Sequence, residues 1–235
     1  MMFFEMTKKL GNECFDGSGN ILPSAVLECF ENAAGAHAEI LGCGFDEMNS
    51  KGLLWVIVRT RYEVLEQPKA EGEIKVKTWP LRPKSVGFRR EYLLCDNDDK
   101  VLIKGTSDWF VINISDRCLA KAEGIYPEDE YLEDEAIEGR VKRVRSYKGE
   151  ATQKTVTPTA ADIDKNGHVN NTKYAAFVYD AFNNNLPIKA FQIDYHKEVM
   201  PNESFALYFA KEGTNAYAEG KNEEGETLFL CEIEC

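Results

Sequence analysis

Three side chains able to do acid–base or hydrogen-bonding chemistry stand at every second position of one short polar stretch. Asp164, Asn166 and His168 supply a carboxylate, a carboxamide and an imidazole. In an extended or looping backbone, this spacing can direct all three side chains toward one point. Each residue type is also common in ordinary turns. Taken alone, any one of the three is therefore explained as well by a turn as by a functional site. The joint pattern is more specific and indicates a candidate site.

A predicted helix follows this stretch directly. From Asn170 to Phe182 the apolar residues recur at helical spacing, and Asn170 and Asn171 are good N-cap candidates. The three polar side chains are therefore expected at a helix N-terminus, which presents unpaired N–H groups and a partial positive charge. The N–H groups near Asn170 and Asn171 could stabilise an oxyanion, for which one donor is typically worth about 3–4 kcal/mol.

The full pattern Asp-x-Asn-x-His-Val-Asn-Asn-x-x-Tyr resembles the motif of the acyl-ACP thioesterases. These are hot-dog-fold enzymes that release fatty acids from acyl carrier protein (ACP). Stretches that look like the family's occur at 32–38, 52–64, 78–79, 87–92 and 195–198, so the resemblance covers nearly the whole chain. It implies an acyl-ACP hydrolase of fatty acid biosynthesis, with Asp164, Asn166, His168 and Glu198 as catalytic residues.

One position departs from the plant members of the family, which have cysteine directly after the glutamate that corresponds to Glu198. This chain has Val199 there. A Cys–His–Asn mechanism requires a thiolate beside the imidazole, which valine cannot supply. Water attack or a carboxylate-centred mechanism remains, with Glu198 as general base or nucleophile.

The preferred mechanism assigns a role to each of the four residues. Glu198 and His168 activate water, and Asn166 positions the water or the carbonyl group. Asp164 holds Asn166 or the motif turn in place. Nothing in the sequence requires a cofactor or a metal ion.

Composition limits the remaining options. The 235 residues suffice for two fused units of about 100 to 120 residues each. The net charge of −12 argues against nucleic acid and anionic membranes as partners, and no apolar stretch approaches the roughly 18 residues that span a bilayer. The first ten residues do not read as a signal peptide. Seven cysteines without a Cys-x-x-Cys pair favour free thiols in a reducing cytoplasm.

The chain reads as two similar halves around a charged linker. Residues 123–138 carry eight acids and no base, namely Glu123, Glu128, Asp129, Glu130, Glu133, Asp134, Glu135 and Glu138. Residues 140–148 carry five bases and no acid, namely Arg140, Lys142, Arg143, Arg145 and Lys148. This composition is typical of a solvated linker. The expected organisation is an N-terminal domain at 1–122, a linker at 123–149 and a C-terminal domain at 150–235.

Each half repeats the order strand, helix and four strands. The predicted strands are 3–9, 53–66, 73–81, 87–95 and 101–114 in the first half, and 151–156, 190–197, 204–210, 216–220 and 227–233 in the second; the helices are 22–42 and 170–182. One helix can cover only one face of such a sheet. The expected fold is therefore α+β, a double hot dog of two fused units, each an antiparallel sheet wrapped around a central helix. By family analogy, the first unit shapes the acyl-chain pocket and the second carries the catalytic residues.

Two further features bear on the interior and on partners. His37 lies on an apolar helix face and is expected to be a packed core residue. Basic stretches at 82–90 and 140–148 are candidate docking surfaces for the acidic carrier protein with its phosphopantetheine-linked acyl chain, or else merely solvated surface.

Other functions stay open. The motif also resembles that of hydroxybenzoyl-CoA thioesterases, so an acyl-CoA thioesterase is the nearest alternative. A hot-dog dehydratase or a non-catalytic acyl-binding protein are further options. The oligomeric state is also open, and a homodimer is one option.

Overall fold

The computed structural model describes residues 3–127 and 130–235, and the chain divides into two compact units. The first comprises Met1–Asn12 and Glu28–Arg140, and the second Glu13–Leu27 and Val141–Cys235. Glu128 and Asp129 of the acidic run lie outside the described residues. The two units are defined by their compactness, which does not fix the residue at which each fold begins or ends. The domain bounds expected from composition therefore stay a prediction.

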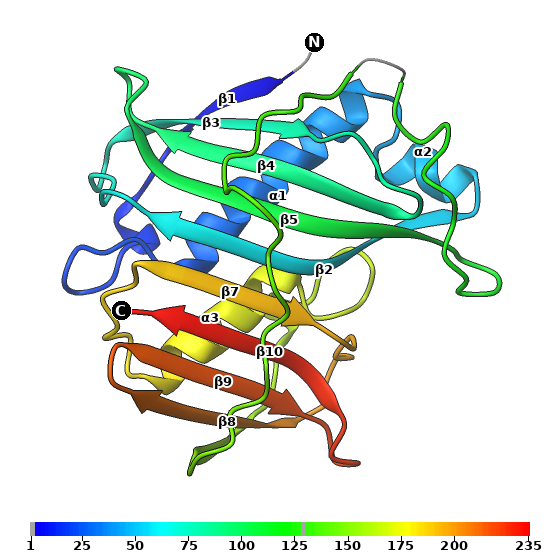
Figure 1. The fold of residues 1–235 in the computed structure, drawn as a ribbon. Coiled ribbons are helices and arrows are strands. Elements are labelled where there is room, and N and C mark those ends of the chain that lie inside the picture. The colour runs from blue at the N-terminus through cyan, green and yellow to red at the C-terminus, as the bar shows by residue number, and fades with distance from the viewer. Residues whose placement is uncertain (1–2, 128–129) are drawn as a thin grey trace. The chain divides into compact units, whose positions relative to one another are not determined.

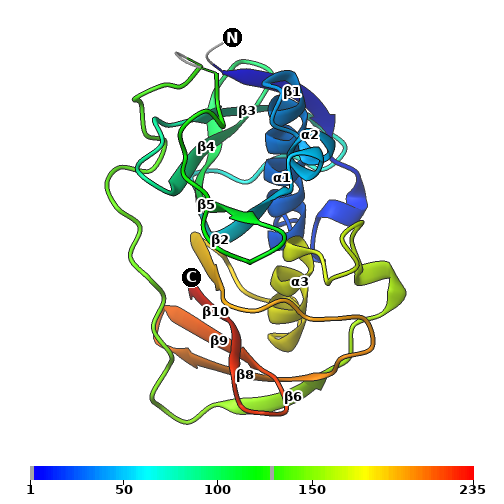
Figure 2. The same ribbon diagram turned by 90° about the vertical axis from the view of Figure 1, so that its right-hand side faces the viewer.

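The first unit is an antiparallel sheet packed against a long helix (Figure 1). The strands β1 (Phe4–Lys9), β2 (Leu53–Val64), β3 (Glu73–Pro80), β4 (Gly87–Cys95) and β5 (Val101–Asn113) pair in the order β1-β3-β4-β5-β2. Helix α1 (Pro23–Ile40), which belongs to this unit from Glu28 onward, lies along one face of the sheet, and the short helix α2 (Phe45–Ser50) follows it (Figure 2). The predicted strands and α1 are confirmed to within two residues at each end. Helix α2 was not predicted, because six residues are too few for a periodic pattern.

The second unit repeats this arrangement. Its strands β6 (Thr152–Val156), β7 (Ala190–Tyr195), β8 (Phe205–Glu212), β9 (Asn215–Lys221) and β10 (Thr227–Glu234) pair in the order β7-β10-β9-β8-β6. Helix α3 (Asn171–Ala181) precedes β7 and packs on the sheet (Figure 2). The predicted repetition of strand, helix and four strands is confirmed.

Aromatic contacts hold the helix on the sheet in each unit. Phe30 of α1 stacks on Tyr92 of β4 with ring centroids 4.2 Å apart. Phe177 of α3 meets Phe205 of β8 edge to face at 5.9 Å. Gly105 of β5 makes room for the first of these contacts, since a Cβ there would collide with the ring of Phe30. The cores are therefore built from the apolar faces that the sequence pattern indicated.

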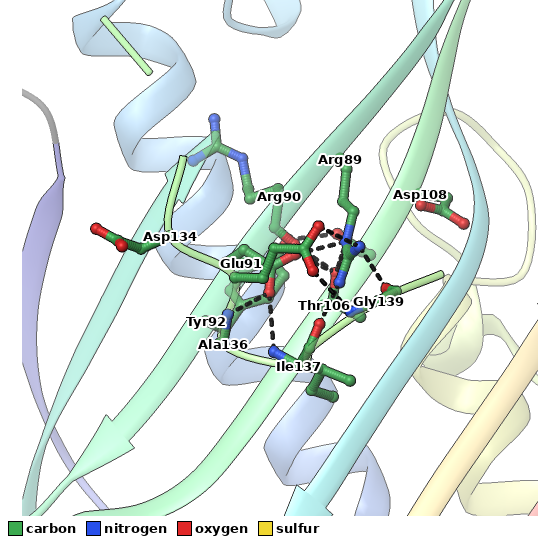
Figure 3. Close-up of polar contacts among 12 residues, drawn as sticks. Arg89, Arg90, Glu91, Tyr92, Thr106, Asp108, Asp134, Ala136, Ile137 and Gly139 are labelled. Atoms are coloured by element: carbon green, nitrogen blue, oxygen red, sulfur yellow. Dashed lines mark hydrogen bonds and ion pairs between the residues drawn. The ribbon is translucent and has the colours of Figure 1, made fainter. Parts of the chain in front are cut away.

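Consecutive side chains of β4 point to opposite faces of the sheet, as in any β-strand, so Arg89 and Arg90 have different surroundings. Arg90 is 4% exposed, and its Nη1 atom lies 3.0 Å from Nδ1 of His37, which is fully buried on α1. The expectation that His37 is a core residue is confirmed. Arg89 lies on the other face of the sheet, where it meets the linker (Figure 3). Arg90 is thus buried, and the prediction of a docking surface at 82–90 is wrong for it. Arg89 is partly covered by the linker, whereas Arg82 and Lys84 of the same stretch are exposed.

The first part of the linker is tied to β4 by hydrogen bonds to an ion pair of that strand, Arg89–Glu91 (Figure 3). Glu91 has a fully buried side chain, lies 2.7 Å from Nε of Arg89, and accepts hydrogen bonds from the backbone N–H groups of Ala136 and Ile137 at 2.8 and 3.2 Å. Arg89 donates to the carbonyl oxygens of Ile137 and Gly139 at 2.6 and 2.8 Å. The acidic part of the linker is therefore anchored to the first unit and is not simply solvated.

The second part of the linker is anchored in the same way to the second unit. The backbone N–H of Val144 donates to the buried Asp194 of β7 at 3.2 Å, and the hydroxyl of Ser146 donates to Glu219 of β9 at 2.7 Å. The bases of this stretch, Lys142, Arg143, Arg145 and Lys148, are exposed. The linker therefore contributes polar anchors to the fold while its basic side chains face solvent.

Candidate active site

A tight turn in the second unit is built around Asp164. Its Oδ1 atom accepts hydrogen bonds from the backbone N–H groups of Asn166 and His168 at 2.8 and 3.3 Å. Its Oδ2 atom accepts from the Asn166 side chain at 3.1 Å. Gly167 has a φ of 82°, a conformation that glycine adopts without steric cost. The turn therefore orients the Asn166 carboxamide through the Asp164 carboxylate.

Helix α3 begins immediately after this turn. Asn170 is its N-cap, with the side chain accepting a hydrogen bond from the Thr172 N–H at 2.8 Å, as predicted. The backbone N–H of Asn170 donates to the carbonyl of Asp162 at 2.8 Å, so this group is not available to an oxyanion and the expectation for it is wrong. Among the residues that the structure describes, none accepts a hydrogen bond from the Asn171 N–H. The Asn171 N–H therefore stays the candidate oxyanion donor at this helix start, and that role is a prediction.

Glu198 approaches this helix start from the segment that follows β7. The strand ends at Tyr195, two residues before its predicted end, so Glu198 lies in a loop. Its Oε2 atom is 3.5 Å from Nε2 of His168, and the side chains are 46% and 21% exposed. That distance is at the outer limit of a hydrogen bond, and contacts between catalytic groups are often this long before substrate binds. Both groups are accessible to a substrate or a water molecule.

The structure thus joins the four predicted site residues as two pairs. Asn166 bonds to Asp164, and His168 faces Glu198. The backbone N–H of His168 donates to Asp164 and so links the two pairs, whereas no side chain of one pair bonds to a side chain of the other in the described part of the chain. The arrangement places an imidazole–carboxylate pair and an oriented carboxamide at a helix N-terminus. The catalytic roles of these residues stay predictions.

The residue after Glu198 has an interior position. The side chain of Val199 is fully buried, and its backbone N–H donates to the hydroxyl of Tyr174 at 3.1 Å. The side chain at position 199 therefore lies in the interior, whereas the imidazole of His168 is partly exposed. Tyr174 itself was assigned only to the apolar face of the helix. The signal that could have revealed it was a tyrosine one helical turn after the N-cap, a position that points back toward the helix start.

The cysteine thiols are the other potential nucleophiles of the chain. The seven cysteines are free thiols, and Cys118 alone is exposed. In the parts of the chain that are described, no cluster of three His, Cys, Asp or Glu side chains is placed to hold a metal ion. Nor does any described helix combine the length and apolar character needed to cross a bilayer.

Solved structures define the class of fold. An acyl-ACP thioesterase from Bacteroides thetaiotaomicron superimposes with a TM-score of 0.88 at 22% identity, covering 99% of this chain and 97% of that one. The 12:0-ACP thioesterase from Umbellularia californica gives a TM-score of 0.84 at 21% identity, covering 100% and 97%. At these identities the likeness is one of fold, and the fold is the double hot dog.

Sequence profiles define the family. The profile of the acyl-ACP thioesterase N-terminal domain matches residues 4–128, and that of the C-terminal domain matches residues 145–232. The chain belongs to the acyl-ACP thioesterase family. The chloroplastic dodecanoyl-[acyl-carrier-protein] hydrolase of Umbellularia californica is 28% identical over 202 residues, which cover 78% of this chain and 52% of that protein. The chain thus spans about half the length of the curated relatives it matches.

Proposed function

We propose that this protein hydrolyses the thioester of acyl-ACP and releases a free fatty acid and the thiol of the carrier protein. The observation that carries the proposal is the 3.5 Å approach of His168 Nε2 to Glu198 Oε2 at the start of α3. Membership of the acyl-ACP thioesterase family supports the same reaction.

In the proposed mechanism, Glu198 and His168 take a proton from water while its oxygen attacks the thioester carbonyl carbon. Asn166, held by Asp164, positions the water or the carbonyl group. The oxyanion that forms is stabilised by the Asn171 N–H and the positive end of the α3 dipole. The C–S bond then breaks, and a thiolate with a pKa of roughly 8.5 leaves without strong acid assistance.

The acyl carrier protein is the proposed partner. Carrier proteins are strongly acidic, and this chain has a net charge of −12, so a local basic surface must dominate at docking distance. In the 82–90 stretch Arg90 is buried, Arg89 is largely covered and Arg82 pairs with Glu133, whereas the four linker bases at 142–148 are all exposed. The linker is therefore the proposed docking surface. By family analogy, the first unit shapes the pocket for the acyl tail.

We place the protein in the cytoplasm. Six of its seven cysteines are buried free thiols, which suits a reducing compartment.

A panel of acyl-ACP and acyl-CoA substrates of varied chain length, scored by free thiol, tests the function. We expect thiol release with a higher kcat/KM for acyl-ACP. Equal or better turnover of acyl-CoA would reassign the substrate class. Absence of thiol from both would point to a dehydratase or to a non-catalytic acyl-binding protein, and dehydration of a 3-hydroxyacyl substrate separates those two.

A further inference from the structure

The loop that bears Glu198 is held by backbone hydrogen bonds on both sides of the glutamate. Before it, the N–H group of Lys197 donates to the carbonyl of Leu228 in β10 at 3.0 Å. After it, the carbonyl of Val199 accepts from the N–H of Val169 in the motif turn at 2.9 Å. The remaining backbone group of Val199, its N–H, donates to the side chain of Tyr174. Tyr174 is thus the side chain that anchors Val199, and Glu203 anchors the next residue by accepting from the Met200 N–H at 2.9 Å.

The ring of Tyr174 is held rigidly. The residue is 2% exposed and meets Phe229 at 5.1 Å and Tyr195 at 5.8 Å, both edge to face. Such packing leaves the ring little rotational freedom. The hydroxyl oxygen is therefore a fixed acceptor, 3.1 Å from the Val199 nitrogen.

The hydroxyl also stays neutral. Burial, with a smaller contribution from the carboxylates of Glu198, Glu203 and Asp164, raises the pKa of Tyr174 well above its usual value. The group therefore does not serve as a proton acceptor at physiological pH. A neutral, immobile hydroxyl at this place can hold a backbone amide but is not suited to take part in the proton transfer itself.

We propose that Tyr174 is a positioning residue that fixes the Glu198 carboxylate opposite His168 through the N–H of Val199. The inference rests on the proposed thioesterase function. A carboxylate on a loop without this anchor would sample positions in which it no longer faces the imidazole, and misplacement by about 1 Å can cost 100-fold in rate. Because the anchor holds the base and not the substrate, its loss acts on kcat and leaves KM unchanged.

The test uses Tyr174→Phe, which removes the hydroxyl and keeps the ring. Tyr179→Phe is the matched control, because Tyr179 lies on the same helix, is also 2% exposed, and donates its hydroxyl to Asp16 at 2.8 Å, away from the site. We expect kcat for acyl-ACP to fall about 10- to 100-fold in Tyr174→Phe with KM unchanged, and to stay within about twofold in Tyr179→Phe. Equal effects of the two variants would overturn the inference.

A double variant that combines Tyr174→Phe with Glu198→Gln distinguishes a positioning role of Tyr174 from a general loss of stability. If Tyr174 acts through Glu198, adding Tyr174→Phe to Glu198→Gln should lower kcat no further, whereas a merely structural effect would multiply with it. A wild-type protein that releases no thiol would instead defeat the proposed function. Should Tyr174→Phe fail to fold, replacing the Val199 amide by an ester removes the donor from the other side of the bond. An unchanged kcat in that ester would also overturn the inference.

Discussion

The Nε2 atom of His168 and the Oε2 atom of Glu198 lie 3.5 Å apart, although the whole of α3 and β7 separates them in sequence. The first residue belongs to a turn fixed by Asp164, and the second to a loop fixed at Val199. The pair is therefore assembled by hydrogen bonds within the turn and within the loop, and the bond from the Val169 N–H to the Val199 carbonyl joins the two segments.

Glu198→Gln keeps the shape of the side chain and removes its basicity. We expect kcat for acyl-ACP to fall by about 100-fold or more, because Glu198 is the carboxylate that the structure places opposite Nε2 of His168. Thermal unfolding should be unchanged, since Glu198 is 46% exposed. Glu223→Gln, an exposed acid in the loop between β9 and β10, is the charge-matched control. Activity of Glu198→Gln within a few-fold of wild type would remove Glu198 from the mechanism.

Alkylation of thiols under native conditions should leave turnover intact. Burial raises the pKa of Cys43 to about 11, and it raises that of Cys231 well above the usual value, so neither is a ready nucleophile. Only Cys118 is exposed, and we expect mass spectrometry to find it as the main site of modification. The variant Cys118→Ser should then resist labelling and retain full activity. Inactivation that follows one buried cysteine, is prevented by substrate and spares the fold would contradict this.

The anchor between the linker and β9 should weaken in acid. Burial alone would raise the pKa of Glu219, but hydrogen bonds from Ser146 and Thr227 and the charge of Lys221 outweigh it, so the pKa lies below its usual value. A carboxyl group with a lowered pKa stabilises the fold above its unfolded pKa of about 4.3, and that contribution disappears as the pH falls through the folded value.

The variant Glu219→Gln measures this contribution. At pH 7 it should lower the free energy of unfolding by about 1 kcal/mol, and near pH 3 the difference from wild type should be smaller. Urea unfolding at the two pH values gives both numbers. A difference that is constant with pH would show that the charge of Glu219 is not what stabilises the linker.

Charge reversal in the linker should slow the association of this protein with the carrier protein. We expect Arg143→Glu combined with Arg145→Glu to lower kcat/KM for acyl-ACP about 10-fold at low salt and to leave acyl-CoA turnover unchanged. Rising salt should reduce the wild-type kcat/KM for acyl-ACP toward the value of the variant. Lys211→Glu, at an exposed base of β8, controls for net charge. If the charge reversals do not change kcat/KM for acyl-ACP and its KM does not depend on salt, acyl-CoA would be the better-supported substrate class.

Local patterns in the sequence determined the elements and several of their details. Helical periodicity placed α1 and α3, alternation placed the strands, and Asn170 was correctly predicted as the N-cap. The apolar surroundings of His37 correctly indicated a core residue. These features depend on neighbours within one or two turns of the chain, and such short-range preferences can be read without knowing the fold.

Only the tertiary structure determined which partner each polar group binds. Arg89 and Arg90 look like one basic patch in the sequence, but strand alternation sends one to the linker and the other to His37. The Asn170 N–H is bound by Asp162, and the hydroxyl of Tyr174 is bound by Val199. Each of these partners is set by how loops, strands and helices pack together. A single sequence cannot specify such partners, because the free energy of a polar contact depends on which groups the fold brings within about 3 Å.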